Sequence, residues 1–220
     1  MKILDIPRSG SYAGVTSSHN RAGQYIRNRR TPTNAPTARR TFIRSAFGSQ
    51  AAGYAALTSV QQAAWISAAA SHPVTDSLGQ SITLTGQQLF VSVNTALLNA
   101  SAATVTAPPS TFAVFSVAGS SLSFSLATGL DVTLTTTGAA GDFILIAPSR
   151  PMSAGRNFNK TFTQMDVEAG NAASASITTA DYSAQFGAPV VGQKVFVRVT
   201  PVSSKGVTGV PLVLSALVTV

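Results

Sequence analysis

The chain has 220 residues, of which only 10% are charged, and it contains no cysteine. This length is enough for one large or two small domains with a sizeable core. The lack of cysteine excludes disulfides, thiolate metal sites and thiol nucleophiles. No hydrophobic signal core and no apolar run of about 18 residues is present, so we expect no membrane-spanning segment.

The net charge of +8 is concentrated in the first third of the chain. Residues 1–75 contain nine basic residues and one acidic residue, whereas residues 76–220 contain six of each. Such an asymmetry indicates an acidic partner for the N-terminal segment, either nucleic acid or an acidic protein surface.

Residues 1–36 show neither helical nor strand periodicity and combine arginines with Gly, Ser, Asn, Thr and Pro. Such a segment buries too little apolar surface to order itself, so we predict an extended basic arm that lies along a partner. Arginine binds carboxylates and phosphates with two hydrogen bonds, so a protein clamp, a nucleic-acid contact and a solvated tail are the alternatives, the clamp being preferred. The predicted contact residues of the arm and of the helix after it are Arg21, Tyr25, Arg27, Arg29, Arg30, Arg39, Arg40 and Arg44.

Residues 37–104 are predicted to form a small helical region. The first helix begins after Thr37, and the next two begin at Thr58 and Thr85, each of which has a glutamine three residues later in the spacing of a capping box. The segment between the second and third helices is predicted as a loop. The predicted helical core consists of Phe42, Phe47, Trp65, Leu89 and Phe90.

Residues 105–220 change to a period of two, which is typical of strands. Seven short segments alternate with Gly, Pro, Asp and Ser turns. They are FAVFSVAGSSLSFSLA, DVTLTTT, DFILIA, NKTFTQMDV, SASITT, KVFVRVTPV and VPLVLSALVTV. Seven strands in about 110 residues is the pattern of a sandwich. The predicted fold is therefore mainly β: an arm, a helical hairpin or bundle, and an antiparallel β-sandwich of immunoglobulin or fibronectin type III character.

Groups that could carry catalysis are few. His19 lies in the arm and His72 precedes a proline, and neither has a Ser and Asp at a spacing known from catalytic triads. No pair of metal ligands has a known spacing, and we interpret Asp166 and Glu168 as a solvated pair. We therefore expect no enzymatic activity, no metal and no cofactor.

One aromatic pair allows a further contact hypothesis. Phe158 and Phe162, in the polar stretch RNFNKTF, are the best candidates for a contact patch on the predicted sandwich, although packing in a core or hairpin is the preferred interpretation. A carbohydrate-binding role would need exposed Trp or Tyr for sugar stacking, and the only tryptophan, Trp65, is in the helical region.

A family resemblance extends over residues 10–100. It rests on the string GQYIRNRRTPTNAPTARR, on Thr58, Gln61, Ala63, Ala64 and Trp65, and on Leu84, Thr85, Gly86, Gln88 and Phe90. These residues resemble uncharacterised structural proteins of tailed bacteriophages and prophages, some of which carry immunoglobulin-like domains. The resemblance implies a place in the virion and supplies no catalytic residues.

We therefore expect a structural virion protein that is assembled in the host cytoplasm. It would be a capsid decoration or minor capsid protein, or a head–tail or tail component. The expected partners are major capsid, portal or connector, or tail subunits, with further copies of the chain in the particle and no membrane. The alternative is a DNA-binding or genome-packaging accessory protein whose arm contacts nucleic acid.

Overall fold

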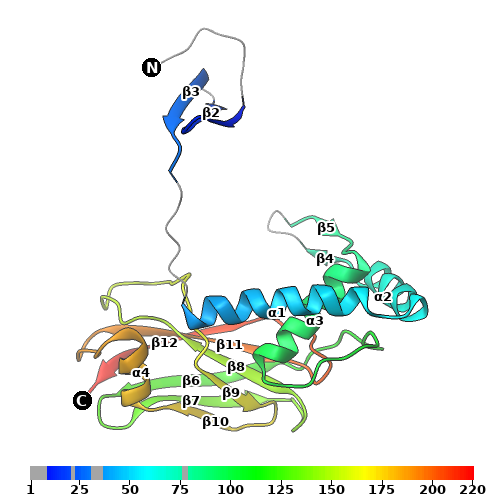
Figure 1. Ribbon diagram of the computed structural model, residues 1–220. Coiled ribbons are helices and arrows are strands. Elements are labelled where there is room, and N and C mark those ends of the chain that lie inside the picture. The colour runs from blue at the N-terminus through cyan, green and yellow to red at the C-terminus, as the bar shows by residue number, and fades with distance from the viewer. Residues whose placement is uncertain (1–8, 21–22, 31–36, 76–78) are drawn as a thin grey trace. The chain divides into compact units, whose positions relative to one another are not determined.

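The computed structural model describes residues 9–20, 23–30, 37–75 and 79–220 of the chain (Figure 1). The chain divides into two compact units, residues 1–41 and residues 42–220. The second unit contains both the helices and the large sheet. The predicted boundary between residues 104 and 105 therefore does not separate two compact units.

The first unit contains a three-stranded antiparallel sheet formed by β1 (Gly10–Tyr12), β2 (Val15–Asn20) and β3 (Gly23–Asn28). The prediction that residues 1–36 have no regular structure of their own is wrong for these strands. Ala13 and Gly14, which join β1 to β2, both have positive φ values, 43° and 80°. Two positive φ values are typical of the tight type I′ hairpin turn, which Asn-Gly signals in a sequence but Ala-Gly does not.

The three predicted helices are confirmed as α1 (Ala38–Ala55), α2 (Ser59–Ser71) and α3 (Gly86–Asn99). Both capping boxes form: the hydroxyls of Thr58 and Thr85 accept from backbone N–H groups, and the side chains of the glutamines accept in return. These reciprocal bonds satisfy donors that a helix start otherwise leaves unpaired. Two very short strands, β4 (Val74–Thr75) and β5 (Ser81–Ile82), pair within the predicted loop.

The helical core forms around Trp65, Leu89 and Phe90, which are buried as predicted. The rings of Trp65 and Phe90 meet edge to face, with centroids 5.2 Å apart. The prediction is wrong for Phe42 and Phe47, which are 40% and 60% exposed. Phe42 lies in the first half of α1 and Phe47 near its middle, whereas contacts with the core are made near the end of this helix, at Ala51 and Tyr54. Periodicity identifies an apolar face, but not how much of that face a neighbour covers.

Seven strands of the second unit form one sheet. It consists of β6 (Val117–Ser125), β7 (Gly129–Thr136), β8 (Phe143–Pro148), β9 (Asp166–Ala169), β10 (Ser174–Ile177), β11 (Lys194–Val202) and β12 (Leu212–Thr219). The order is β10-β7-β6-β12-β11-β8-β9, and every pair is antiparallel except β12 and β6. The mainly β prediction for this region is confirmed. The prediction of a strand at NKTFTQMDV (159–167) is wrong for residues 159–165, because β9 begins only at Asp166.

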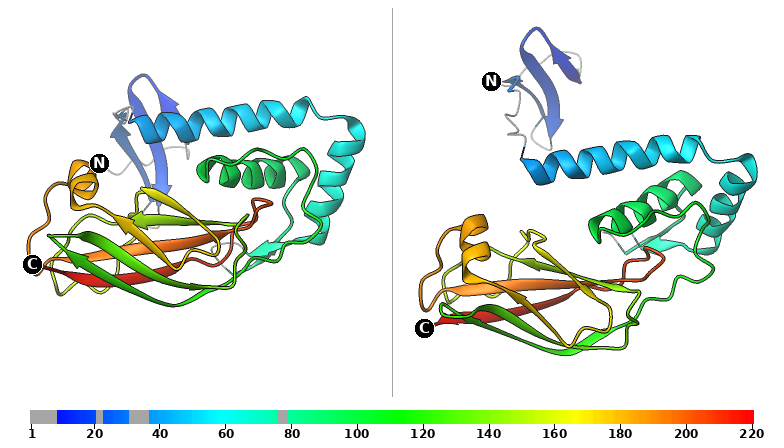
Figure 2. Two further views of the ribbon diagram at one scale, coloured as in Figure 1. Left: turned by 90° about the horizontal axis from the view of Figure 1, so that it is seen from below. Right: turned by 60° about the horizontal axis from the view of Figure 1, so that its bottom comes forward.

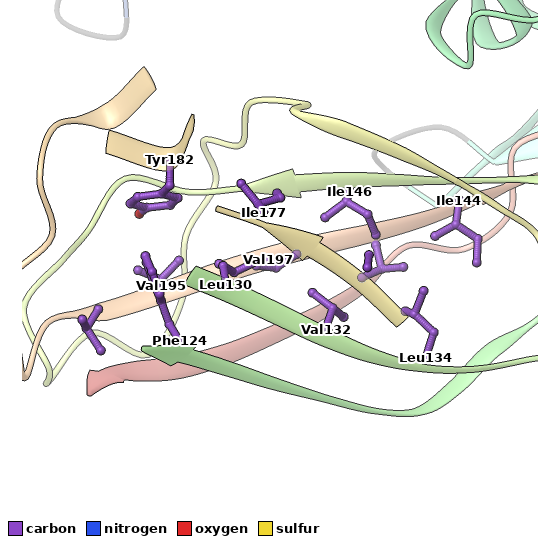
Figure 3. Close-up of a cluster of buried hydrophobic side chains, with 13 residues drawn as sticks. Phe124, Leu130, Val132, Leu134, Ile144, Ile146, Ile177, Tyr182, Val195 and Val197 are labelled. Atoms are coloured by element: carbon purple, nitrogen blue, oxygen red, sulfur yellow. The ribbon is translucent and has the colours of Figure 1, made fainter. Parts of the chain in front are cut away.

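The sheet curls like half of a barrel, as Figure 2 shows from two further sides. Alternate residues of each strand face the inside of the curl. On β11 these are Val195, Val197 and Val199, all fully buried. They pack against buried residues of β7 and β8, including Leu130 and Ile146 (Figure 3). This alternation is the reason for the period of two in the sequence.

A fourth helix, α4 (Thr179–Phe186), joins β10 to β11 and was not predicted. Its Tyr182 is fully buried beside Phe124 (Figure 3). The Tyr182 hydroxyl donates to the backbone oxygen of Ser149 at 2.7 Å. Burial raises the pKa of the Tyr182 hydroxyl well above its ordinary value. The helix therefore supplies an aromatic side chain to one end of the core.

Specific contacts join the helical region to the segments that lead into β6 and β9. The Trp65 indole donates to the backbone oxygen of Thr106 at 2.8 Å, and the Asn94 side chain makes two hydrogen bonds with the backbone of Val105. The Gln164 amide, which precedes β9, donates to the backbone of α3 at 2.7 Å. These contacts explain why residues 42–220 form one compact unit. Within the described ranges, no helix has the length and apolar character needed to cross a membrane.

Candidate functional site

The sheet of the first unit has two different faces. Strand geometry places Tyr25 and Arg27 on one face of β3, opposite Ser18 and Thr16 of β2. The other face carries Ile26, and Tyr12 and Val15 stand on this face on the neighbouring strands. One face is thus polar and basic. The other, which we call the apolar face, carries Tyr12, Val15 and Ile26 among the polar side chains of Ser17, His19, Gln24 and Asn28.

The remaining arm arginines extend the basic character. Arg29 and Arg30 follow β3 directly and are exposed, whereas Arg21 lies outside the described residues. Residues 1–41 contain eight basic residues and one acidic residue. The unit therefore carries a strong positive potential that favours an acidic partner.

This sheet does not bury its apolar face. In residues 9–20 and 23–30 no residue whose exposure is described is buried; Tyr12 is 84% and Ile26 is 46% exposed. The side-chain oxygen of Gln24 is buried without a hydrogen-bond partner in the described structure, an arrangement that costs about 1–3 kcal/mol. A three-stranded sheet needs a covered hydrophobic face for independent stability. A neighbour that covers the sheet and supplies a donor would remove both deficits.

The predicted arginines of α1 lie in its first two turns. Arg39, Arg40 and Arg44 have exposed side chains, and partial burial lowers the pKa of Arg39 from its ordinary value. Cations at the start of a helix oppose its dipole, at a cost of about 0.3–1 kcal/mol each. Helix stability therefore does not account for three arginines at this position.

A groove of about 610 Å³ lies between α1 and α3 in the second unit. Phe47 and Ala51 line it from α1, and Val91 and Thr95 are among its lining residues on α3. The Thr95 hydroxyl is buried there without a hydrogen-bond partner in the described residues. The exposed Phe47 ring thus stands at the rim of an apolar groove instead of inside the helical core.

The histidines and acids are dispersed. His19 is exposed on β2, and the ring of His72 stacks on Phe112 with centroids 4.0 Å apart. Asp166 accepts a hydrogen bond from the backbone of Val167, and the pKa of Glu168 is raised by burial first and then by the neighbouring Asp166. In the described ranges, no three His, Cys, Asp or Glu side chains are placed to hold a metal ion.

Phe158 and Phe162 differ in their exposure to solvent. Phe158 is 60% exposed, so the preferred prediction of packing is wrong for this residue. Phe162 is half-buried, with the Arg198 guanidinium 5.1 Å from the centre of its ring. Sequence reasoning did not find the contact between Arg198 and Phe162, because the two residues are far apart in the sequence and only the fold brings them together.

Comparison with protein-family models, with curated proteins and with solved structures gives no match. The function is therefore inferred from the residues and their placement.

Proposed function

We propose that the chain is a non-enzymatic structural protein of a tailed-phage particle, anchored to neighbouring subunits by its Arg-rich arm. The observation that carries the proposal is the small, strongly basic sheet of β1, β2 and β3, which has no buried side chain among its described residues. In this role it is a capsid decoration or minor capsid protein, or a head–tail or tail component. Its partners are other virion proteins and further copies of the chain.

The arm supports this proposal by its energetics. Ordering a residue costs about 1–2 kcal/mol of backbone entropy, which burial of apolar surface normally offsets. The apolar side of this sheet, with Tyr12 and Ile26, remains exposed in the isolated chain. A neighbouring subunit offers the missing cover, and its carboxylates pair with the arginines on the opposite side.

The second unit supports the role of a projecting domain. In our proposal its sheet is an immunoglobulin or fibronectin type III-like sandwich, with β6, β7 and β10 in one layer and β8, β9, β11 and β12 in the other. The two layers would be joined only by two parallel residue pairs between β12 and β6. A division of seven strands into layers of three and four is that of immunoglobulin-related sandwiches.

The second candidate is a DNA-binding or genome-packaging accessory protein whose arm contacts nucleic acid. The exposed Arg27, Arg29 and Arg30 favour it, because phosphates attract the same side chains as carboxylates. It accounts less well for the exposed apolar face of the arm sheet, because a phosphate backbone provides no apolar cover.

Incorporation into particles tests the proposal. The phage that encodes the chain is propagated with the wild-type gene, with residues 1–36 deleted, or with Arg27→Gln, Arg29→Gln and Arg30→Gln together. A matched control removes three cations from the second unit, as Lys160→Gln, Lys194→Gln and Arg198→Gln. The amount of chain in purified particles is then measured by quantitative mass spectrometry, with DNA-filled and empty particles analysed separately.

We expect both arm variants to fold and to be lost from the particles, while the control is retained. Equal loss of the control would show that general charge, and not the arm, determines incorporation. Retention only in DNA-filled particles would favour the nucleic-acid candidate. Normal incorporation of the arm deletion would refute anchoring by the arm.

A further inference from the structure

A second cationic surface lies on the outer side of β11, away from the core. On this strand Lys194 and Arg198 lie on the side opposite the buried valines; Phe196 lies between them on the same side but is itself buried, with 3% of its surface exposed. Lys194 and Arg198 are four residues apart, a spacing of about 13 Å along a strand. Both cations lie against aromatic rings: the Lys194 ammonium is 5.5 Å from the centre of the Phe196 ring, and Arg198 lies over Phe162.

The segment 150–163 adds three more cations to this surface. Its beginning is held to β11 by two backbone hydrogen bonds between Met152 and Lys194, of 2.9 and 2.8 Å. Its end returns to the same strand, since Phe162 contacts Arg198 and Thr163 donates to the backbone of β8. The segment carries Arg150, Arg156 and Lys160, all exposed.

Phe158 occupies the middle of this segment and is 60% exposed. The Arg156 guanidinium donates to the backbone oxygen of Phe158 at 3.2 Å, and the Lys160 ammonium is 5.9 Å from the centre of the Phe158 ring. The Asn159 side chain hydrogen-bonds to the backbone of Thr161, which fixes the turn beyond the ring. An exposed ring is thus held between two cations by local bonds.

No carboxylate of the described residues neutralises the charges of this surface. Five of the six basic residues in 76–220 belong to it; the sixth is Lys205. Throughout the described part of the chain, none of the five forms an ion pair with a carboxylate. Asp166 and Glu168 pair with Ile146 and Ile144 on β8, so strand alternation places these acids on the opposite side of the sheet from Arg198. We call this surface, formed by Arg150, Arg156, Phe158, Lys160, Phe162, Lys194 and Arg198 over the buried Phe196, the basic-aromatic face.

We propose that the basic-aromatic face binds single-stranded nucleic acid, with its cations on the phosphates and the Phe158 ring stacked on a base. Proteins that bind single strands without sequence preference combine a cationic track with exposed aromatic rings. Phenylalanine offers a stacking surface with no polar group, so it suits a base better than a sugar hydroxyl. The inference does not depend on the arm or on the proposed place in a particle.

Fluorescence anisotropy of the full chain tests this assignment, with a labelled single strand of about 20 nucleotides, long enough for the usual site sizes, and the matching duplex. Lys160→Gln, Lys194→Gln and Arg198→Gln are combined in one variant, and Arg27→Gln, Arg29→Gln and Arg30→Gln form a control with the same loss of charge in the arm. Phe158→Ala is compared with Phe47→Ala, because both rings are 60% exposed and only the first belongs to the face. Circular dichroism confirms that each variant is folded.

We expect the triple substitution in the face to reduce the salt slope for the single strand by about two, because each lost phosphate contact removes about 0.7. Phe158→Ala should weaken binding of the single strand about tenfold and duplex binding much less, whereas Phe47→Ala should change neither. Equal effects of the two phenylalanine substitutions on single-strand binding would overturn the proposal. A salt slope that changes only with the arm substitutions, and not with those in the face, would also overturn it. The face would be a general polyanion surface if heparin binding needed the cations but not Phe158 and the single strand bound only weakly. That result would overturn the nucleic-acid assignment.

Discussion

The turn between β11 and β12 packs directly against α3, so a single methyl group there tests whether the helices and the sheet unfold together. Gly206 in this turn has φ +81°, and a Cβ atom at this position would lie 2.5 Å from the backbone oxygen of Val93. Leu97 would be 2.9 Å away. Gly192 provides a matched control, because it has φ +85° and nothing within 4 Å of its Cβ position.

Gly206→Ala and Gly192→Ala share the cost of a left-handed backbone conformation, and only Gly206→Ala has the further cost of overpacking against α3. Alanine in the left-handed region costs about 1–2 kcal/mol at either position. Gly206→Ala also forces α3 away from the turn, and overpacking of this kind costs about 1–3 kcal/mol. We therefore expect Gly206→Ala to lower the free energy of unfolding by roughly 2–5 kcal/mol and Gly192→Ala by about 1–2 kcal/mol.

Urea unfolding followed by two probes measures both the cost and the cooperativity. Trp65 is the only tryptophan and is fully buried among the helices, so its fluorescence reports the helical core. Far-ultraviolet circular dichroism near the β minimum reports the sheet. Coincident transitions are the test of a single cooperative unit. We expect the two curves to coincide in the wild type and to shift together in Gly206→Ala.

Two results would contradict this reasoning. If Gly206→Ala were no more destabilising than Gly192→Ala, the contact with Val93 would not hold the helices to the sheet. If the transition in Trp65 fluorescence and the transition in circular dichroism had different urea midpoints in the wild type, the helical region would be an independent domain. This is what the predicted boundary between residues 104 and 105 requires.

Three further outcomes follow from the buried hydroxyl, the acidic pair and the uncovered arm. Tyr182→Phe should lower the free energy of unfolding by about 1–3 kcal/mol, because it leaves the buried carbonyl of Ser149 unpaired. Tyr12→Phe, at an 84% exposed position, should have no effect. Equal effects of the two substitutions would contradict the stabilising role of the Tyr182 hydrogen bond. The raised pKa of Glu168 means that the folded chain binds more protons than the unfolded chain above pH 4.5, so this residue makes stability fall as pH rises through its folded pKa. Glu168→Gln should therefore stabilise the chain at pH 7 by a few tenths of a kcal/mol and not at pH 4. A loss of stability at pH 7 would contradict the cost of burying this carboxylate beside Asp166. Amide hydrogens of β2 and β3 should exchange rapidly in the isolated chain and slowly in the particle; slow exchange in the isolated chain would show that the sheet needs no neighbour.

Local signals were sufficient for α1, α2 and α3 and for the strands of the second unit other than β9, which begins only at the end of the segment predicted for it. A capping box such as Thr58 with Gln61 involves residues three apart, and its geometry depends on nothing distant. The strands were predicted because one face is buried, which fixes alternation, as Val195, Val197 and Val199 show. In both cases the pattern in the sequence is the direct result of the local structure.

The missed features depend on contacts that are distant in sequence or on unusual turns. The α4 helix has eight residues, and its only buried side chain, Tyr182, bonds to Ser149, 33 residues earlier. The arm hairpin turns at Ala13, a residue that rarely has a positive φ value. The basic-aromatic face combines β11 with a loop about 40 residues earlier, and only the fold shows that Arg198 and Phe162 meet.

The two cationic surfaces differ in a way that bears on what each can bind. The arm sheet presents arginines beside an apolar face that the described residues leave uncovered, so the protein neighbour that we propose would supply both carboxylates and apolar cover. The basic-aromatic face stands on a strand whose other side is fully buried, and its rings are already in contact with its cations. It is ordered before any ligand binds and needs no cover, so it suits a solvated polyanion that leaves most of its own backbone in water. Binding at one surface therefore does not depend on the other, and the arm and face substitutions separate them.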